Sequence, residues 1–89
     1  MTIVFSGSHR GHYQYRVIVR DERNIYYLQA TETGSFWDSR HFRIGSALCS
    51  DSDEFDLYHG LNLARMRAMA GPVLNADTAF DLFMILSRD

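Results

Sequence analysis

Hydrophobic and polar residues alternate along residues 12–20 of this chain, with Ile18 as the one apolar residue at a polar position. Because successive side chains of a strand point to opposite faces, this alternation predicts a half-buried β-strand. One face would carry Tyr13, Tyr15, Val17 and Val19, and the other His12, Gln14, Arg16, Ile18 and Arg20.

Three further segments in the first half of the chain favour strands. Residues 25–31 are rich in strand-forming side chains and follow a polar break at 21–24, which predicts a hairpin with the first strand. Residues 36–48 alternate again and predict a third strand. Met1 to Phe5 is apolar and is a candidate fourth strand, separated from the first by a loop over residues 6–11.

The pattern changes to a helical period near residue 51. Asp51 and Glu54 have the spacing of a capping box, and carboxylates are favoured at a helix N-terminus. We therefore predict a helix over residues 53–70, ended by Gly71-Pro72. Projected on a helix, its apolar residues form two separate stripes, which implies two packing partners.

A second helix is predicted over residues 76–87, with Asn75 or Asp77 as its cap. Its apolar residues cover more than half of the circumference, which is wider than one sheet contact requires. The run 83–86 is also compatible with a short strand.

These elements predict one α+β domain over residues 1–89, with residues 1–49 rich in strands. We expect a three- to four-stranded, mainly antiparallel sheet with the two C-terminal helices packed on one face. The surplus apolar side chains of the helices either pack against each other or form a stripe for a dimer or another partner. The candidate stripe consists of Phe55, Tyr58, Met66, Met69 and Phe83.

The composition of the chain bears on its cellular compartment and on its possible partners. The single Cys49 cannot form an intramolecular disulfide, which suits a reducing compartment, so we expect a cytoplasmic protein. Nowhere do eighteen apolar residues run together, so we expect no membrane span. The net charge of −2 removes the simplest argument for nucleic-acid binding.

Charge is nevertheless distributed unevenly. All nine basic residues are arginines, and the first fifty positions carry six of them against four carboxylates, whereas the last thirty-nine carry three against seven. If helices cover the tyrosine–valine face of the sheet, the opposite face is left with arginine and aromatic side chains. The candidate partner-binding residues on that face are Arg16, Arg20, Tyr27, His41 and Arg43.

Motifs for catalysis or for metal binding are absent from the chain. His9 and His12 alone have a short ligand spacing, and structural zinc sites require paired ligands from two places. The Ser6-Gly7-Ser8-His9 segment contains a serine and a histidine but lacks the Gly-x-Ser-x-Gly elbow of a hydrolase. We therefore expect no metal, no cofactor and no enzymatic activity, and a small hydrolase-like enzyme remains the least favoured interpretation.

Two classes of function remain for the arginine–tyrosine face, beside a merely solvated outer face. Tyrosine and arginine are enriched at protein-binding hot spots, and they also stack bases and bind phosphates on sheet platforms. We favour a non-enzymatic protein-interaction module, self-associating as a homodimer or bound to a larger protein, of the kind that phages and mobile elements use as inhibitors or adaptors. A nucleic-acid binder is the alternative.

Overall fold

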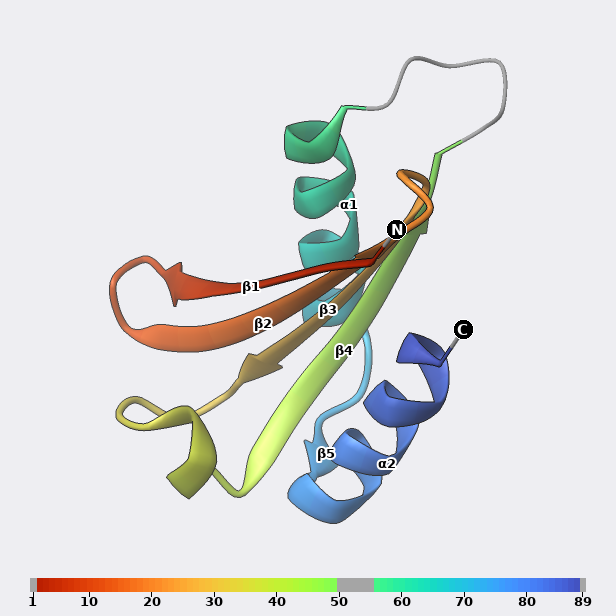
Figure 1. Ribbon diagram of the computed structural model, residues 1–89. Coiled ribbons are helices and arrows are strands. Elements are labelled where there is room, and N and C mark those ends of the chain that lie inside the picture. The colour runs from red at the N-terminus through yellow and green to blue at the C-terminus, as the bar shows by residue number, and fades with distance from the viewer. Residues whose placement is uncertain (1, 50–55, 89) are drawn as a thin grey trace.

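The computed structural model describes residues 2–49 and 56–88 and has an α+β architecture (Figure 1). Five strands form one antiparallel sheet in chain order, β1-β2-β3-β4-β5. The strands are β1 (Thr2–His9), β2 (Tyr13–Arg20), β3 (Asn24–Ala30), β4 (His41–Leu48) and β5 (Leu74–Asn75). The helices are a short 3₁₀ helix η1 (Phe36–Asp38), α1 (Leu57–Ala70) and α2 (Ala76–Ser87).

Two tight turns build the β1–β2–β3 meander and confirm the predicted β2–β3 hairpin. The backbone takes positive φ at Arg10 and Gly11 in the first turn and at Asp21 and Glu22 in the second. In the second turn the loop has three residues, so that Arg20 pairs with Asn24. This loop length fixes which side chains of β3 share a face with those of β2.

The registers divide the sheet into two faces that bury separate cores. We call the first the α1 face, because its core contains residues of α1. The second core contains residues of α2, and we call its side of the sheet the α2 face. The α1 face carries Val17, Val19, Ile25, Tyr27 and Ala47, and the α2 face carries Ile18, Leu28, Ala30 and Phe42.

Small residues allow α1 to lie directly on β3 and β4. Ala64 and Ala68 of α1 are fully buried, and they lie over Gly45 of β4. A methyl group at Gly45 would overlap the backbone of both alanines, and one at Gly60 would overlap the side chain of Ile25. Glycine at these two positions therefore sets the close approach of the helix to the sheet.

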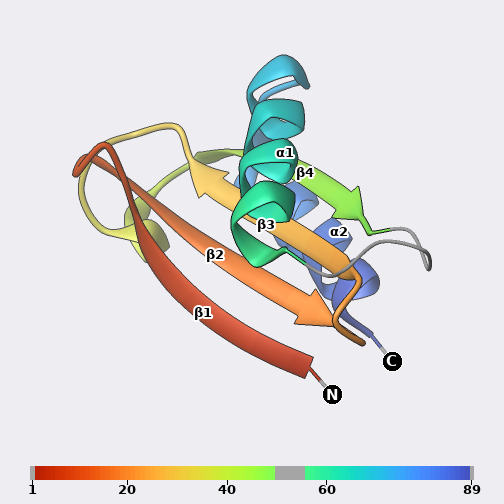
Figure 2. The same cartoon turned by 90° about the horizontal axis from the view of Figure 1, so that it is seen from above.

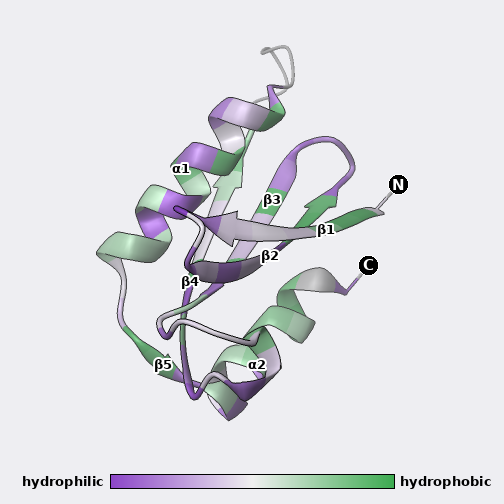
Figure 3. Ribbon diagram, turned by 90° about the vertical axis from the view of Figure 1, so that its left-hand side faces the viewer, coloured by the Kyte–Doolittle hydropathy of each residue, from purple (hydrophilic) through white to green (hydrophobic). Residues whose placement is uncertain are grey.

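Larger side chains hold α2 on the other face. Ala79 and Phe83 of α2 are buried beside Phe42 of β4 and Phe36 of η1. The two helices thus lie on opposite sides of the sheet (Figures 2 and 3). The expectation that both helices pack on one face was wrong, because the sheet carries buried apolar side chains on both faces and each face requires a cover.

Helix boundaries agree with the sequence patterns only in part. The second helix occupies residues 76–87 as predicted, capped by Asn75, whose side-chain oxygen accepts from the amide of Thr78 at 2.9 Å. The alternative of a strand at 83–86 is wrong. The first helix begins at Leu57 instead of residue 53, because Asp56 is its N-cap and accepts from the amide of His59 at 3.1 Å.

The predicted capping pair, Asp51 and Glu54, lies outside the described residues. Gly71 follows the last residue of α1, as predicted. No helix within residues 2–49 and 56–88 combines the length and apolar character needed to cross a bilayer.

Strand boundaries also shifted. β1 continues to His9, through the segment expected to be a loop. The third predicted strand begins only at His41, because residues 36–38 form η1. β5, a two-residue strand beside the start of β4, was not predicted.

Candidate functional site

The five candidate residues of the expected arginine–tyrosine face do not share one surface. Arg16 and Arg20 lie on the α2 face, whereas Tyr27 pairs with Val17 and therefore lies on the α1 face. A four-residue loop between β2 and β3 would have paired Tyr27 with Ile18, on the same face as Arg16. The actual loop is one residue shorter, and a shift of one residue moves every side chain of a strand to the other face.

Two of the arginines bind helix ends instead of facing solvent freely. Arg20 Nη1 donates to the carbonyl oxygen of Leu86 in the last turn of α2, at 3.1 Å. Arg43 Nη1 donates to the carbonyls of Met69 and Gly71 at the end of α1, at 3.2 and 2.8 Å. Since the last carbonyls of a helix have no partner within the helix, these cations stabilise both C-termini.

Tyr27 is part of a buried polar network. Its ring is fully buried, and its hydroxyl donates to Gln29 Oε1 and accepts from Arg65 Nε, the latter at 3.1 Å. Burial raises the pKa of the Tyr27 phenol, although the hydrogen bond from Arg65 opposes this shift. Tyr27 therefore serves the core and offers no surface to a partner.

His41 is bound to the loop that precedes it. Its Nδ1 lies 3.0 Å from Glu32 Oε1, and Glu32 Oε2 accepts from the Arg40 amide at 3.0 Å. The Arg40 amide and then the His41 imidazole hold the pKa of Glu32 below its usual range. These bonds close the loop between β3 and β4, which carries η1.

The predicted apolar stripe is divided between the two sides of the molecule. Tyr58, Met66 and Met69 are exposed on α1, at 81%, 67% and 46% of their surface. Phe83 instead packs in the core of the α2 face, and Phe55 lies outside the described residues. The three α1 residues remain candidates for partner contact, whereas Phe83 does not.

β1 is an edge strand, and no other described segment pairs with its outer side. His12 N donates to the carbonyl of His9 at 3.1 Å and closes the turn where His9 pairs with Tyr13. Inward and outward residues alternate along an antiparallel strand. Because the carbonyl of His9 points toward β2, the backbone groups of Gly7 and Phe5, two and four residues earlier, also face β2. The outward-facing backbone groups belong to Val4, Ser6 and Ser8.

Helices leave β1 largely uncovered, because α1 and α2 lie mainly on β3 and β4 (Figure 1), whereas Val17, Ile18 and Val19 of β2 are buried. Ile3 and Val4 are consequently 47% and 59% exposed, on opposite faces of β1. On the α1 face, a hollow of about 420 Å³ separates β1 and β2 from the start of α1; it is lined by Phe5, Tyr15, Leu57, Tyr58, Leu61, Asn62 and Arg65.

Two adjacent hollows lie on the α2 face. The apolar hollow, of about 340 Å³, lies between β1, β2, η1 and α2, and the polar hollow, of about 700 Å³, lies beside the β1–β2 turn and the loop before η1. Arg16, Phe36 and Trp37 line both of them. We call the two hollows and this shared wall the Arg16 cleft.

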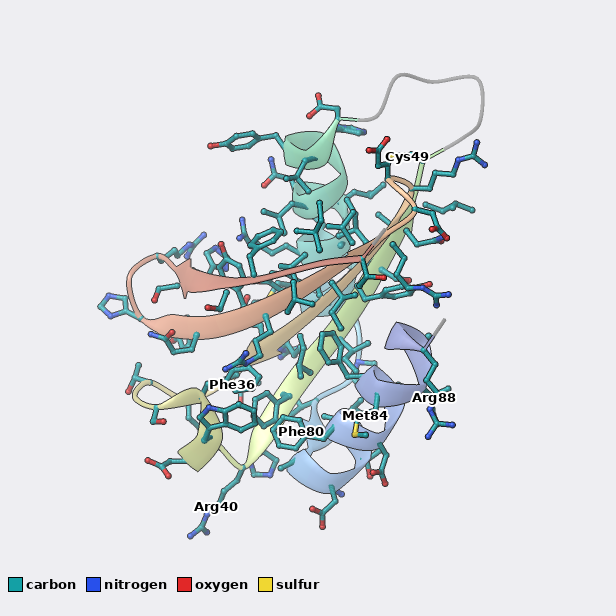
Figure 4. All side chains as sticks on the ribbon, viewed as in Figure 1. Phe36, Arg40, Cys49, Phe80, Met84 and Arg88 are labelled. Carbon is teal, nitrogen blue, oxygen red and sulfur yellow. The ribbon has the colours of Figure 1, made fainter. Side chains whose placement is uncertain are left out.

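An aromatic cluster forms the side of the Arg16 cleft nearest to α2. The rings of Phe36 and Phe80 are 5.9 Å apart, and Figure 4 shows them together between η1 and α2, with Met84 nearby. The Arg16 guanidinium carbon lies 4.7 Å from the centre of the Trp37 ring and 5.0 Å from that of Phe36. Cation–π contacts of this kind fix the position of the charge.

Sequence patterns had indicated Arg16 but missed the aromatic residues around it. Trp37 was expected in the third strand and Phe80 among the surplus apolar residues of the second helix, whereas Trp37 lies in η1 and is 67% exposed. The available signal was the only tryptophan of the chain, placed between Gly34 and Asp38 in a turn-forming segment.

No three His, Cys, Asp or Glu side chains come together as a potential metal site in the described part of the chain. No protein-family model, curated protein or solved structure matches this sequence and fold. The candidate function must therefore be argued from the surface itself.

Proposed function

We propose that this protein is a non-enzymatic protein-interaction module that binds a partner by adding a strand to β1. The observation that carries this proposal is the open outer edge of β1, eight residues long and exposed along most of its length. Unpaired amides and carbonyls in a row are a template for an extended segment of another chain, which is the recognition mode of β-augmentation.

Composition of the strand supports this role. Exposed sheet edges are usually protected by charged residues, proline or a bulge. Residues 2–8 of β1 contain no charged residue and no proline, and all eight residues of the strand pair with β2 in unbroken register. The apolar side chains of Ile3 and Val4 would be covered on both faces by side chains of the added strand.

Nucleic-acid binding receives less support from the same geometry. It relied on Arg16, Arg20 and Arg43 acting together on one face, and two of these guanidiniums donate to helix carbonyls. Backbone amides can donate to phosphate oxygens, but the carbonyls that alternate with them find no donor on a phosphate group, whereas an extended peptide complements both.

A second copy of the chain is one partner that this edge suits. β1 can pair with β1 of another copy antiparallel about a twofold axis, with Ser6 and its outward-facing neighbours in contact. Centred on Ser6, such pairing would join the two sheets into one and place the Phe5 side chains of the two copies diagonally across the new strand pair on the α1 face. If this protein is an inhibitor or adaptor, its larger target would bind in the same way, through an extended segment that pairs with β1.

The test is a proline at Ser6, with Ser6→Ala as the matched control. Proline is tolerated at an edge position whose amide faces solvent, so Ser6→Pro should fold while losing one outward donor and blocking strand addition. We expect immobilised wild-type protein and Ser6→Ala to retain the same partner from nuclease-treated extract and Ser6→Pro to lose it.

Self-association is measured in the same set of proteins by light scattering. If the partner is a second copy, wild type and Ser6→Ala should show twice the 10.3 kDa chain mass and Ser6→Pro the mass of one chain. Equal partner capture and equal mass for Ser6→Pro and wild type would contradict the proposal, and loss of binding on nuclease treatment would favour the nucleic-acid alternative.

A further inference from the structure

Arg16 differs from the other arginines of the expected binding face in having no polar partner. Arg20 and Arg43 donate to helix carbonyls, whereas Arg16 makes no hydrogen bond or ion pair within the described part of the chain. Its Nε is buried and lacks an acceptor. A buried donor without an acceptor costs free energy, so this guanidinium gains from an added anion.

Two aromatic rings fix the position of the Arg16 cation. The Trp37 and Phe36 rings lie 4.7 and 5.0 Å from the guanidinium carbon, which holds the planar group against the wall between the two hollows. Binding an anion there would therefore require little additional ordering of the Arg16 side chain. A guanidinium presents its donors as a fork that matches both oxygens of a carboxylate.

The surfaces on the two sides of this wall differ in chemistry. The apolar hollow is formed, apart from the wall, by the side chains of Val4, Ile18, Leu28, Phe80, Phe83 and Met84. The polar hollow is open beside His12 and Gln14. The apolar hollow has a volume of about 340 Å³, which is enough for a short hydrocarbon chain or a single ring.

We propose that the Arg16 cleft binds a small monocarboxylic acid with an aliphatic or aromatic body. The carboxylate pairs with the Arg16 guanidinium, and the body occupies the apolar hollow beside Ile18 and Phe83. Charge complementarity at Arg16 selects an acid over a neutral apolar molecule. The site lies on the α2 face and does not use the outward amides of β1, so it goes beyond strand addition and stands independently of it.

The protein carries its own reporter for this site. Trp37 is the only tryptophan of the chain and lies in the wall of the cleft, so ligand binding should change its fluorescence. The probes are octanoate, 1-octanol and acetate, titrated separately. Octanoate has both the charge and the chain, 1-octanol has the chain alone, and acetate has the charge alone.

We expect octanoate to saturate the Trp37 signal at about a tenfold lower concentration than 1-octanol, because the acid adds a charge-assisted hydrogen bond. Acetate should produce no saturable change at the same concentrations. Added salt should weaken the binding of octanoate and leave that of 1-octanol almost unchanged.

Substitution at Arg16 isolates the charge. Arg16→Gln should bind octanoate and 1-octanol equally, and Arg16→Lys, which keeps the charge without the fork, should fall between Gln and wild type. Arg10→Gln is the matched control, since it removes the same charge from the exposed β1–β2 turn. Thermal unfolding of each variant checks that the fold is retained.

Three results would overturn the proposal: no saturable response of Trp37 to octanoate, equal affinity of the wild type for octanoate and 1-octanol, or unchanged octanoate affinity in Arg16→Gln. If Arg16→Gln does not fold, the salt dependence and the octanoate to octanol ratio of the wild type decide alone. Ser6→Pro should bind octanoate normally, so a failure of this site is distinguishable from a failure of strand addition.

Discussion

The two halves of the sheet are built from similar strands and differ in what covers them. β3 and β4 lie between α1 on one face and α2 on the other, and Ile25, Tyr27, Leu28 and Phe42 are fully buried there. β1 and the first half of β2 are less covered: Ile3 and Val4 are about half exposed, although Val17, Ile18 and Val19 of β2 are buried. We call β3 and β4 the covered pair and β1 and β2 the outer pair.

This difference assigns stability to one half of the sheet and binding to the other. Apolar burial is the dominant favourable contribution to folding, and most of it lies at the covered pair. The outer pair retains apolar side chains, an open edge and hollows on both faces, which are features of interaction surfaces. Substitutions in the two halves should therefore have unequal effects on stability.

Replacing a large apolar side chain by alanine should show the largest difference in stability loss between the covered pair and the outer pair. Phe42 is fully buried in the covered pair, and Phe42→Ala should lower the free energy of unfolding by about 4 kcal/mol. Ile3 of the outer pair is 47% exposed, and Ile3→Ala should cost about 1 kcal/mol or less. Urea unfolding followed by circular dichroism measures both, and equal losses would remove the distinction between the two pairs.

Glycine substitutions should give the next largest contrast. Gly45→Ala places a methyl group in the backbone of Ala64 and Ala68, and α1 must move away, at a cost of about 3 kcal/mol. Gly7→Ala in the outer pair meets only the end of the Tyr15 side chain, which can rotate, so we expect about 1 kcal/mol. Comparable unfolding midpoints for the two variants would show that α1 is not held closely on β4.

A stabilising substitution should be available where the two pairs join. Glu22, in the β2–β3 turn, has a φ of +57°, a conformation that costs an ordinary residue about 1 kcal/mol. Glu22→Gly should therefore raise stability by about 0.5 kcal/mol, after the greater flexibility of glycine in the unfolded chain is deducted. Arg23 has no positive φ, so Arg23→Gly should lower the stability of the protein. A stability gain for Arg23→Gly together with a loss for Glu22→Gly would contradict the turn geometry.

The smallest expected effect is the pH dependence of the loop that carries η1. The pKa of Glu32 is lowered in the folded protein, so its contribution to stability is present above its ordinary value near 4.5 and is lost as the pH falls through the lowered pKa. Glu32→Gln should lack this dependence. The thermal midpoints of wild type and variant, compared between pH 6 and pH 3, should converge on acidification, and a constant difference would exclude this role for Glu32.

The sequence was informative wherever a local pattern decided the outcome. Alternation along residues 12–20 identified β2 and its faces, and the polar break before residue 25 identified the β2–β3 hairpin. The cap at Asn75 and the end of α1 at Gly71 also follow from local chemistry. Each of these features depends only on residues that are close together in the sequence.

The surface was less predictable because it depends on register and on long-range packing. One residue fewer in the β2–β3 loop moved Tyr27 away from Arg16, and the sequence allowed either loop length. The opposite placement of the helices had a signal, since residues 25–28 are apolar on both faces of β3, a pattern typical of strands buried on two sides. The Arg16 cleft joins residues from β1, β2, η1 and α2, which no local pattern connects.

Amide hydrogen exchange along β1, measured by NMR in dilute free protein and again with the captured partner, tests the open edge most directly. In the free protein we expect slow exchange at Phe5 and Gly7, whose amides face β2, and fast exchange at Ser6 and Ser8. Addition of the partner should slow Ser6 and Ser8 as well. Uniform protection of β1 in the free monomer, or persistent fast exchange at Ser6 and Ser8 in the complex, would contradict docking at this edge.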